Sequence, residues 1–183
     1  MESLPQTRVA DFLPLTTTNS RRFVETFSSS ITAQAVRFRL PGDLVQDVVQ
    51  ETLIRALRGL ERFRGEAKLS TWVYRIAYRE CLRAKEKHLR HQGGVVSLDP
   101  MADPESGERD ATDVVEREDE VLRVRRMMSR LPDDQRLVLG YHYLEGMGVA
   151  EIADLMGSTS NTVKSWLKRG RETLRDLLGE STS

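Results

Sequence analysis

The fold is decided by residues 131–178, which read LPDDQRLVLGYHYLEGMGVAEIADLMGSTSNTVKSWLKRGRETLRDLL. Apolar residues recur through this stretch at helical intervals, and glycines interrupt the pattern twice. The interruptions divide the stretch into three predicted helices, which begin at about Asp133, Val149 and Ser160. A small helical unit is therefore expected at this end of the chain.

The last two of these helices are joined by the turn Gly157-Ser158-Thr159, which is typical of a helix-turn-helix. Thr159 is placed to cap the final helix. One face of that helix is apolar and must be the buried one, with Val163, Leu167, Gly170, Leu174 and Leu177. The other face is polar and basic, with Asn161, Lys164, Ser165, Lys168, Arg171 and Arg175. Such a face suits phosphates and base edges in the major groove, although a solvated amphipathic helix and a protein-contact surface are the alternatives.

The N-terminal half is predicted to form a second helical unit with its own core. Its first helix is expected to start at an N-cap, Ser20, and to run to the stop at Pro41-Gly42. The second is expected from Asp43 to about Leu60, and the third from Ser70 to about Arg90. The second is strongly amphipathic, with the polar face Asp47, Gln50, Glu51 and Arg55.

Two residues of the third predicted helix have alternative interpretations. Trp72 lies beside Val73 and Ile76, which favours a core position over a platform for a nucleic-acid base. Cys81 is interpreted as a core residue, and a redox role is the alternative.

Between the two units, residues 92–112 contain glycines and prolines among acidic neighbours, which indicates a flexible linker. The helical pattern resumes near Asp113, so the C-terminal domain is placed at 113–183 and the N-terminal domain at 20–91. The first 19 residues are interpreted as a flexible arm, in which Phe12 is nevertheless able to dock.

The net charge of zero conceals a segregation of charge along the chain. Residues 1–91 carry 16 basic and 10 acidic side chains, a formal charge of +6. Residues 92–122 carry 2 and 10, a charge of −8, and residues 123–183 carry 10 and 8, a charge of +2. Two basic bodies separated by an acidic strip indicate a protein that binds a polyanion.

Several classes of protein are disfavoured by the sequence. No apolar run approaches the roughly 18 to 20 residues of a membrane span, so a cytoplasmic protein is expected. A single cysteine excludes an intramolecular disulfide, and three scattered histidines make a poor zinc-ligand set, so neither metal nor cofactor is assigned. There is no glycine-rich phosphate loop and no nucleophile motif, which argues against an enzyme.

Two stretches of the chain resemble a known family. Residues 47–79, DVVQETLIRALRGLERFRGEAKLSTWVYRIAYR, resemble the second conserved region of extracytoplasmic-function (ECF, group 4) sigma factors of bacterial RNA polymerase, through QET, FRGEA and YRIA. Residues 131–178 are similar to the fourth region, through YLEG, EIA and TVKS. The resemblance covers about residues 20–91 and 113–178. It implies an all-α protein in which a region 2 three-helix domain and a region 4 helix-turn-helix domain are joined by the flexible acidic linker.

The resemblance also implies a function and its site residues. It implies an alternative sigma factor, a subunit without catalysis of its own that directs polymerase to promoters. The polymerase core would be bound, on its β′ coiled coil, by Asp47, Gln50, Glu51 and Arg55. The −10 element would be bound by Phe63, Arg64, Lys68, Ser70, Thr71, Tyr74, Arg75, Tyr78, Arg79 and Arg83. The −35 element would be bound by Thr159, Ser160, Asn161, Lys164, Ser165, Lys168, Arg169 and Arg171.

The partners implied are the core polymerase (β′ and β subunits), promoter DNA and an anti-sigma factor. Membrane insertion of this chain is not expected; it would lie in the cytoplasm, at the nucleoid when active or near the membrane when an anti-sigma factor holds it. A free-standing helix-turn-helix regulator is the competing hypothesis, but it leaves FRGEA and the QET face unexplained. An enzyme has little support.

The sequence departs from the family pattern at six positions. Arg79 and Arg83 stand where Asn and Asp are usual, which puts contacts there in doubt. Gly148 replaces a Ser or Thr cap. In the helix-turn-helix, Ser158, Asn161 and Trp166 replace an apolar residue, a Gly and an Arg. We expect Trp166 to pack against the neighbouring helix, with a contact to DNA or an inhibitor as a second role.

Overall fold

The structure is a computed structural model of the chain, and it describes residues 7–91, 123–124 and 126–180. Every regular element in these ranges is helical, in agreement with the predicted all-α class. The N-terminal half contains η1 (Val9–Asp11), α1 (Thr17–Arg37), α2 (Gly42–Gly59), η2 (Leu60–Arg62) and α3 (Leu69–His91). The C-terminal half, from residue 123 onward, contains α5 (Asp133–Leu139), η3 (Gly140–Leu144), α6 (Val149–Met156) and α7 (Ser160–Glu180). The predicted linker and the helix start near Asp113 lie outside the described residues.

Helix α1 begins earlier than the sequence suggested. Thr16 is the N-cap, and its Oγ1 accepts a hydrogen bond from the Asn19 backbone N–H at 3.1 Å. The prediction of Ser20 as the cap is therefore wrong. Helix α1 also ends before Pro41, because Arg39, with φ 56°, turns the chain towards α2.

The segment before α1 is packed onto the N-terminal core. Phe12 is buried, and its ring lies 5.2 Å from that of Phe23, edge to face. The flexible arm predicted for residues 1–19 is thus wrong for residues 7–19, where the large apolar area of Phe12 is removed from water. Trp72 packs on the same core against Phe63, which confirms its core interpretation.

The helix-turn-helix is confirmed by its backbone. Gly157 adopts the left-handed conformation, with φ 64°, at the end of α6. The Ser158 N–H then donates to Ala153 O at 2.8 Å, and Thr159 Oγ1 accepts from the Thr162 N–H at 3.2 Å, so Thr159 caps α7 as predicted. The predicted apolar stripe of α7 is buried at Val163 and Leu167 and packs on α5 and α6.

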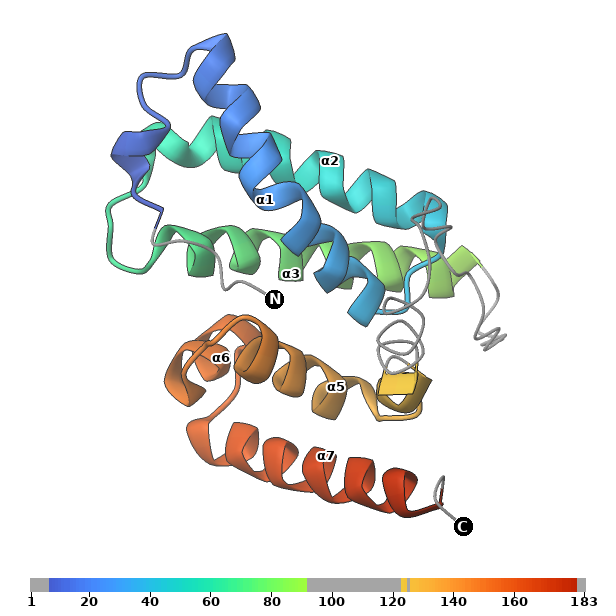
Figure 1. Cartoon of the computed structure of the whole chain (residues 1–183). Helices are drawn as coiled ribbons and strands as arrows, with labels where there is room; N and C mark the ends of the chain where they lie inside the picture. The colour runs from blue at the N-terminus through green and yellow to red at the C-terminus, as the bar shows by residue number, and fades with distance from the viewer. Residues whose placement is uncertain (1–6, 92–122, 125, 181–183) are drawn as a thin grey trace, which may run out of the picture.

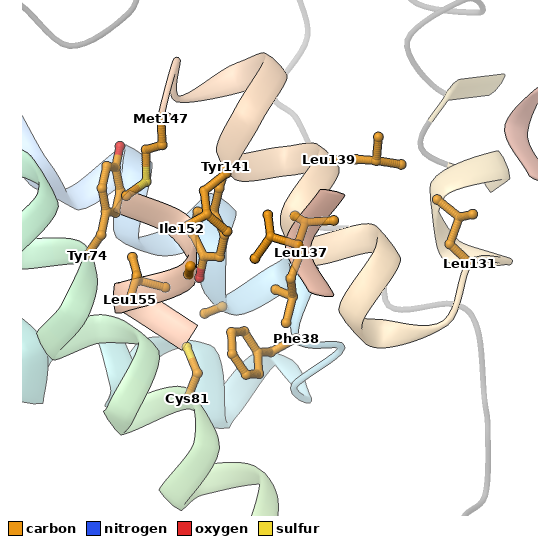
Figure 2. Close-up of a cluster of buried hydrophobic side chains, with 14 of the residues drawn as sticks. Phe38, Tyr74, Cys81, Leu131, Leu137, Leu139, Tyr141, Met147, Ile152 and Leu155 are labelled. Atoms are coloured by element: carbon orange, nitrogen blue, oxygen red, sulfur yellow. The ribbon is translucent and has the colours of Figure 1, made fainter. Parts of the chain in front are cut away.

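The two halves share a hydrophobic core, which the sequence did not predict. In Figure 1, α5 and α6 lie between α3 and α7, and α6 contacts α3. Figure 2 shows Phe38 and Cys81 of the N-terminal half beside Tyr141 and Leu155 of the C-terminal half, and all four belong to one buried cluster. Cys81 is therefore a core residue, as predicted, but of a core made by both halves.

Candidate nucleic-acid and polymerase interfaces

The predicted −35 surface is fully accessible. All eight residues proposed for it, on the turn and on α7, are exposed. Their ties to the rest of the protein are weak: Lys168 Nζ lies 3.9 Å from a Glu172 carboxylate oxygen, and Arg171 donates to the Tyr143 hydroxyl at 3.3 Å. Because α7 packs on α5 and α6 through its buried stripe, the exposed cations and hydroxyls on its other face are accessible to DNA.

The predicted polymerase-binding face lies on α2. Asp47, Gln50 and Arg55 are exposed, and Glu51 is half-buried and pairs with Arg55 at 2.6 Å. Ile54 lies one turn from Gln50 and is 41% exposed, although sequence reasoning did not select it. Ile54 adds apolar area to this otherwise polar face.

The predicted −10 residues fall into two groups, of which the first faces solvent or packs against one of the two hydrophobic cores. Arg64 and Arg79 are exposed, and Ser70 is half-buried. Phe63 and Tyr78 are also half-buried, Phe63 against Trp72 and Tyr78 with its ring 5.4 Å from that of Phe38. Arg83 pairs with Glu80 at 2.6 Å, so the arginine that replaces the family's acidic residue is used within α3.

The second group contacts the C-terminal half, although Lys68 in this group stays 68% exposed. Thr71 and Tyr74 are buried. Four predicted −10 residues contact carboxylates of the C-terminal half, namely Lys68, Thr71, Tyr74 and Arg75. Lys68 Nζ and Thr71 Oγ1 lie 3.7 Å and 3.4 Å from Glu151 Oε1. These four residues, which were predicted to bind DNA, thus contact acidic side chains of the same chain.

Glu145 is the centre of this contact. One carboxylate oxygen accepts from Arg37 at 2.5 Å and the other accepts from the Tyr74 hydroxyl. The Arg37 and Glu145 side chains are only 9% and 10% exposed. Burial, and then the hydrogen bond to Glu145, raise the pKa of Tyr74 far above its usual value, so this tyrosine is a neutral donor.

Gly140 makes room for the Arg37 side chain. A Cβ added at Gly140 would lie 2.6 Å from Arg37 Cδ, so a larger residue would require the Arg37 side chain to shift.

A second polar cluster joins the halves near the start of α5. Arg136 is buried and donates to Arg37 O at 2.7 Å and to Leu131 O at 2.8 Å. Asp133 accepts from both Arg136 and Lys85. Burial alone would raise the pKa of Asp133, but the hydrogen bonds from Lys85 and Arg136 outweigh it and the pKa is lowered.

The ion pairs between the halves follow one pattern of charge. Arg37, Lys68, Arg75 and Lys85 supply the cations from the N-terminal half. Their partners Glu145, Glu151, Asp154 and Asp133 supply the carboxylates from the C-terminal half. The α5–α6 face therefore presents negative charge to a positive surface that is suited to nucleic acid.

Comparisons with known proteins identify the two halves. The family described as Sigma-70 region 2 matches residues 23–92, and the family described as Sigma-70, region 4 matches residues 122–174. The chain is 31% identical over 164 residues to the RNA polymerase sigma-H factor of Pseudomonas aeruginosa, covering 83% of this chain and 82% of that protein. It is 32% identical over 155 residues to the ECF RNA polymerase sigma-E factor of Escherichia coli K12, covering 78% of each. The chain belongs to the ECF sigma factors.

As an ECF sigma factor, the chain directs transcription initiation at promoters. Its region 2 is the α1–α3 unit and its region 4 is the α5–α7 unit. The fold is also that of the sigma factor RpoE from Bartonella quintana, solved in complex with the anti-sigma factor NepR, with a TM-score of 0.70, 21% identity and coverage of 87% of this chain and 96% of that one. Among the described residues, no helix is both long and apolar enough to cross a membrane.

Proposed function

We propose that this chain is a group 4 ECF sigma factor with three separate contact surfaces. The polar face of α2, with Ile54 at its centre, docks on the core polymerase. The loop at 63–68 and the following helix α3 hold the −10 element, and the exposed face of α7 enters the major groove of the −35 element. None of these roles needs catalytic chemistry, because binding energy alone offsets unpairing of the DNA.

One observation carries a further part of this proposal: the −35 surface is exposed, while four of the ten residues of the −10 surface contact the C-terminal half. The two elements, by their names, lie about 25 base pairs apart, which is roughly 85 Å of duplex at 3.4 Å per pair. A compact chain of 183 residues has a radius of gyration of about 16 Å and a diameter of about 40 Å. Regions 2 and 4 must therefore separate before both elements are bound.

The sequence between the halves is long enough for this separation. Residues 92–122 would span at most about 110 Å if fully extended. Their charge of −8 suits the positively charged polymerase channel that later carries RNA, where the linker would imitate the transcript.

The proposed regulator is an anti-sigma factor, which would act in the cytoplasm by holding the halves together. The likeness to RpoE, solved with NepR, supports this partner class. A protein that binds both halves stabilises the covered state relative to the separated one. The stabilisation equals the difference between its binding free energies for the two states.

Transcription in vitro tests the proposal. Purified core polymerase is assayed on candidate promoters with and without this chain, and we expect initiation only with it. The chain alone should bind promoter duplex weakly. A sequence-specific gel shift at submicromolar concentration by the chain alone, without stimulation of core polymerase, would identify a free-standing regulator instead.

A further inference from the structure

Region 4 carries opposite charges on two parts of its sequence. Residues 133–156, which include α5, η3 and α6, contain five carboxylates and one arginine, a formal charge of −4. Residues 160–180, which form α7, contain five basic and three acidic side chains, a charge of +2. The basic helix is the one proposed for the −35 element, so the acidic segment needs a separate explanation.

The acidic segment is directed at region 2. Four of its five carboxylates form ion pairs with cations of the N-terminal half. Asp154 pairs with Arg75, and Glu151 Oε1 lies 3.7 Å from Lys68 Nζ and 3.4 Å from Thr71 Oγ1. Lys68, Thr71 and Arg75 all belong to the proposed −10 surface. Because ammonium, guanidinium and hydroxyl groups donate to phosphate as they do to carboxylate, these carboxylates use the donors that a DNA backbone would use.

The carboxylates satisfy these donors only in part. Asp154 accepts from one terminal nitrogen of Arg75, whereas Arg75 Nε is buried and has no hydrogen-bond partner within the described ranges of the chain. A phosphate can accept from two nitrogens of one guanidinium group at once. Arg75 can therefore donate more hydrogen bonds to a DNA backbone than it donates to Asp154. A contact of this kind is one that DNA is able to displace.

The contact affects the −10 surface and spares the −35 surface. All eight residues proposed for the −35 element are exposed while the halves are together. In Figure 1, α6 faces α3, and α7 lies on the far side of region 4. An effect of the acidic segment on DNA binding should therefore appear with a −10 strand and not with a −35 duplex.

We propose that the acidic α5–α6 face is an intramolecular competitor of the −10 strand, whose carboxylates take the place of DNA phosphates on Lys68, Thr71 and Arg75. The proposal rests on the proposed function. It makes the free chain self-inhibited at the −10 surface even without an anti-sigma factor. Because the strand and the acidic face exclude each other, binding of the strand favours separation of the halves by the same factor by which separation favours binding.

The first measurement is binding of a single strand to the full chain without polymerase. The probe is a labelled oligonucleotide with the non-template −10 sequence of a promoter that the chain transcribes with core polymerase. Asp154→Asn is compared with Asp176→Asn, which removes the same charge from an exposed site on α7. Asp154→Asn should bind up to about fivefold more tightly than this control, the most that an exposed ion pair contributes. The difference should shrink as salt is added, because salt screens exposed pairs.

The second measurement is the reactivity of Cys81 towards a disulfide reagent. Cys81 is 0% exposed in the core that both halves share, so the reagent reaches it when the halves separate. Adding the −10 oligonucleotide should raise the labelling rate of the wild-type chain while circular dichroism stays unchanged. An equal amount of −35 duplex should leave the rate as it was, because α7 is accessible in both states.

Three other outcomes would overturn the proposal. If Asp154→Asn labelled faster at Cys81 but bound the oligonucleotide no better than Asp176→Asn, the contact would hold the halves together without competing with DNA. If the oligonucleotide left the labelling rate unchanged or lowered it, the strand would bind while the halves are together. If no variant bound the oligonucleotide even at low salt, the separated halves would not be the DNA-binding form. Failure of the proposed function is seen separately, as a wild-type chain that starts transcription at no promoter.

Discussion

Glu145 should be the main electrostatic tie that keeps regions 2 and 4 together, and Glu145→Gln tests it. The substitution keeps the shape of the side chain and removes the charge that Arg37 faces at 2.5 Å. Removing one partner of a buried pair costs about 3 to 5 kcal/mol, because the remaining charge is left uncompensated. Here Arg37 returns to water when the halves separate, so the cost falls on the covered state alone. At about 3 kcal/mol the separated population should rise roughly a hundredfold.

The single cysteine of the chain reports this population. Cys81 is 0% exposed in the shared core, and burial raises the pKa of its thiol to about 12. Only the thiolate reacts with disulfide reagents, so the covered chain should react through transient opening. The labelling rate at pH 8 should then follow the separated population and be roughly a hundredfold faster in Glu145→Gln.

Unfolding would also expose Cys81, so a second measurement is needed. Small-angle scattering should show a radius of gyration above the roughly 16 Å of a compact chain, while circular dichroism keeps its helical signal. Asp176→Asn, which removes an exposed carboxylate on α7, serves as the matched control and should behave as wild type. Equal labelling rates in wild type and Glu145→Gln, at unchanged melting temperature, would refute the role given to Glu145.

Three further predictions concern the individual surfaces. Gly170→Ala should lower the stability of region 4 by about 1 to 3 kcal/mol in denaturant melts, because the added Cβ would lie 2.8 Å from Leu139 Cδ1; Gly179→Ala, with open space around it, should be neutral or slightly stabilising. Asn161→Ala and Lys164→Ala should change −35 base preference by about 1 to 3 kcal/mol in a promoter-library selection, whereas Lys168→Ala should weaken all sequences alike and lower the salt slope by about 1. Replacing Gln50 and Glu51 by lysine should weaken binding to core polymerase with little change in the Tm, since Gln50 is exposed and the Glu51 side chain is 44% accessible; co-purification at wild-type stoichiometry would contradict that surface.

The helices, the helix-turn-helix and the apolar stripe of α7 were predictable because each depends on residues that are close together in the sequence. Val163 and Leu167 recur at helical spacing, and Gly157 and Thr159 have local backbone roles. The N-cap of α1 was missed because several hydroxyl residues precede the helix. Thr16 is the cap in a turn that a second hydrogen bond stabilises, from the Asn19 side-chain amide to Pro14 O at 2.9 Å. Cap preferences of single residues do not reveal such a contact.

The contact between the halves had no local signal. Phe38 and Tyr141 have the pattern of core residues, but the pattern does not say that they share one core. Glu145 stands 108 positions from Arg37, and nothing in either segment indicates the pairing. For the same reason the sequence selected Tyr74 and Arg75 for DNA without showing that acidic side chains of the same chain cover them.

Variants of the Arg75–Asp154 pair distinguish two roles of Arg75, which are to hold the halves together and to bind the −10 element. Asp154→Asn loosens the contact and alters no residue proposed for DNA, so promoter opening by the holoenzyme should stay equal or increase. Arg75→Gln loosens the contact to the same extent but also removes a −10 cation, so opening should fall. The pair is partly exposed, with side chains 29% and 68% accessible, so the shared loosening is worth no more than about 1 kcal/mol, or about fivefold in population. If both variants changed promoter opening in the same direction and by the same factor, Arg75 would act only in holding the halves together, and its assignment to the −10 element would be wrong.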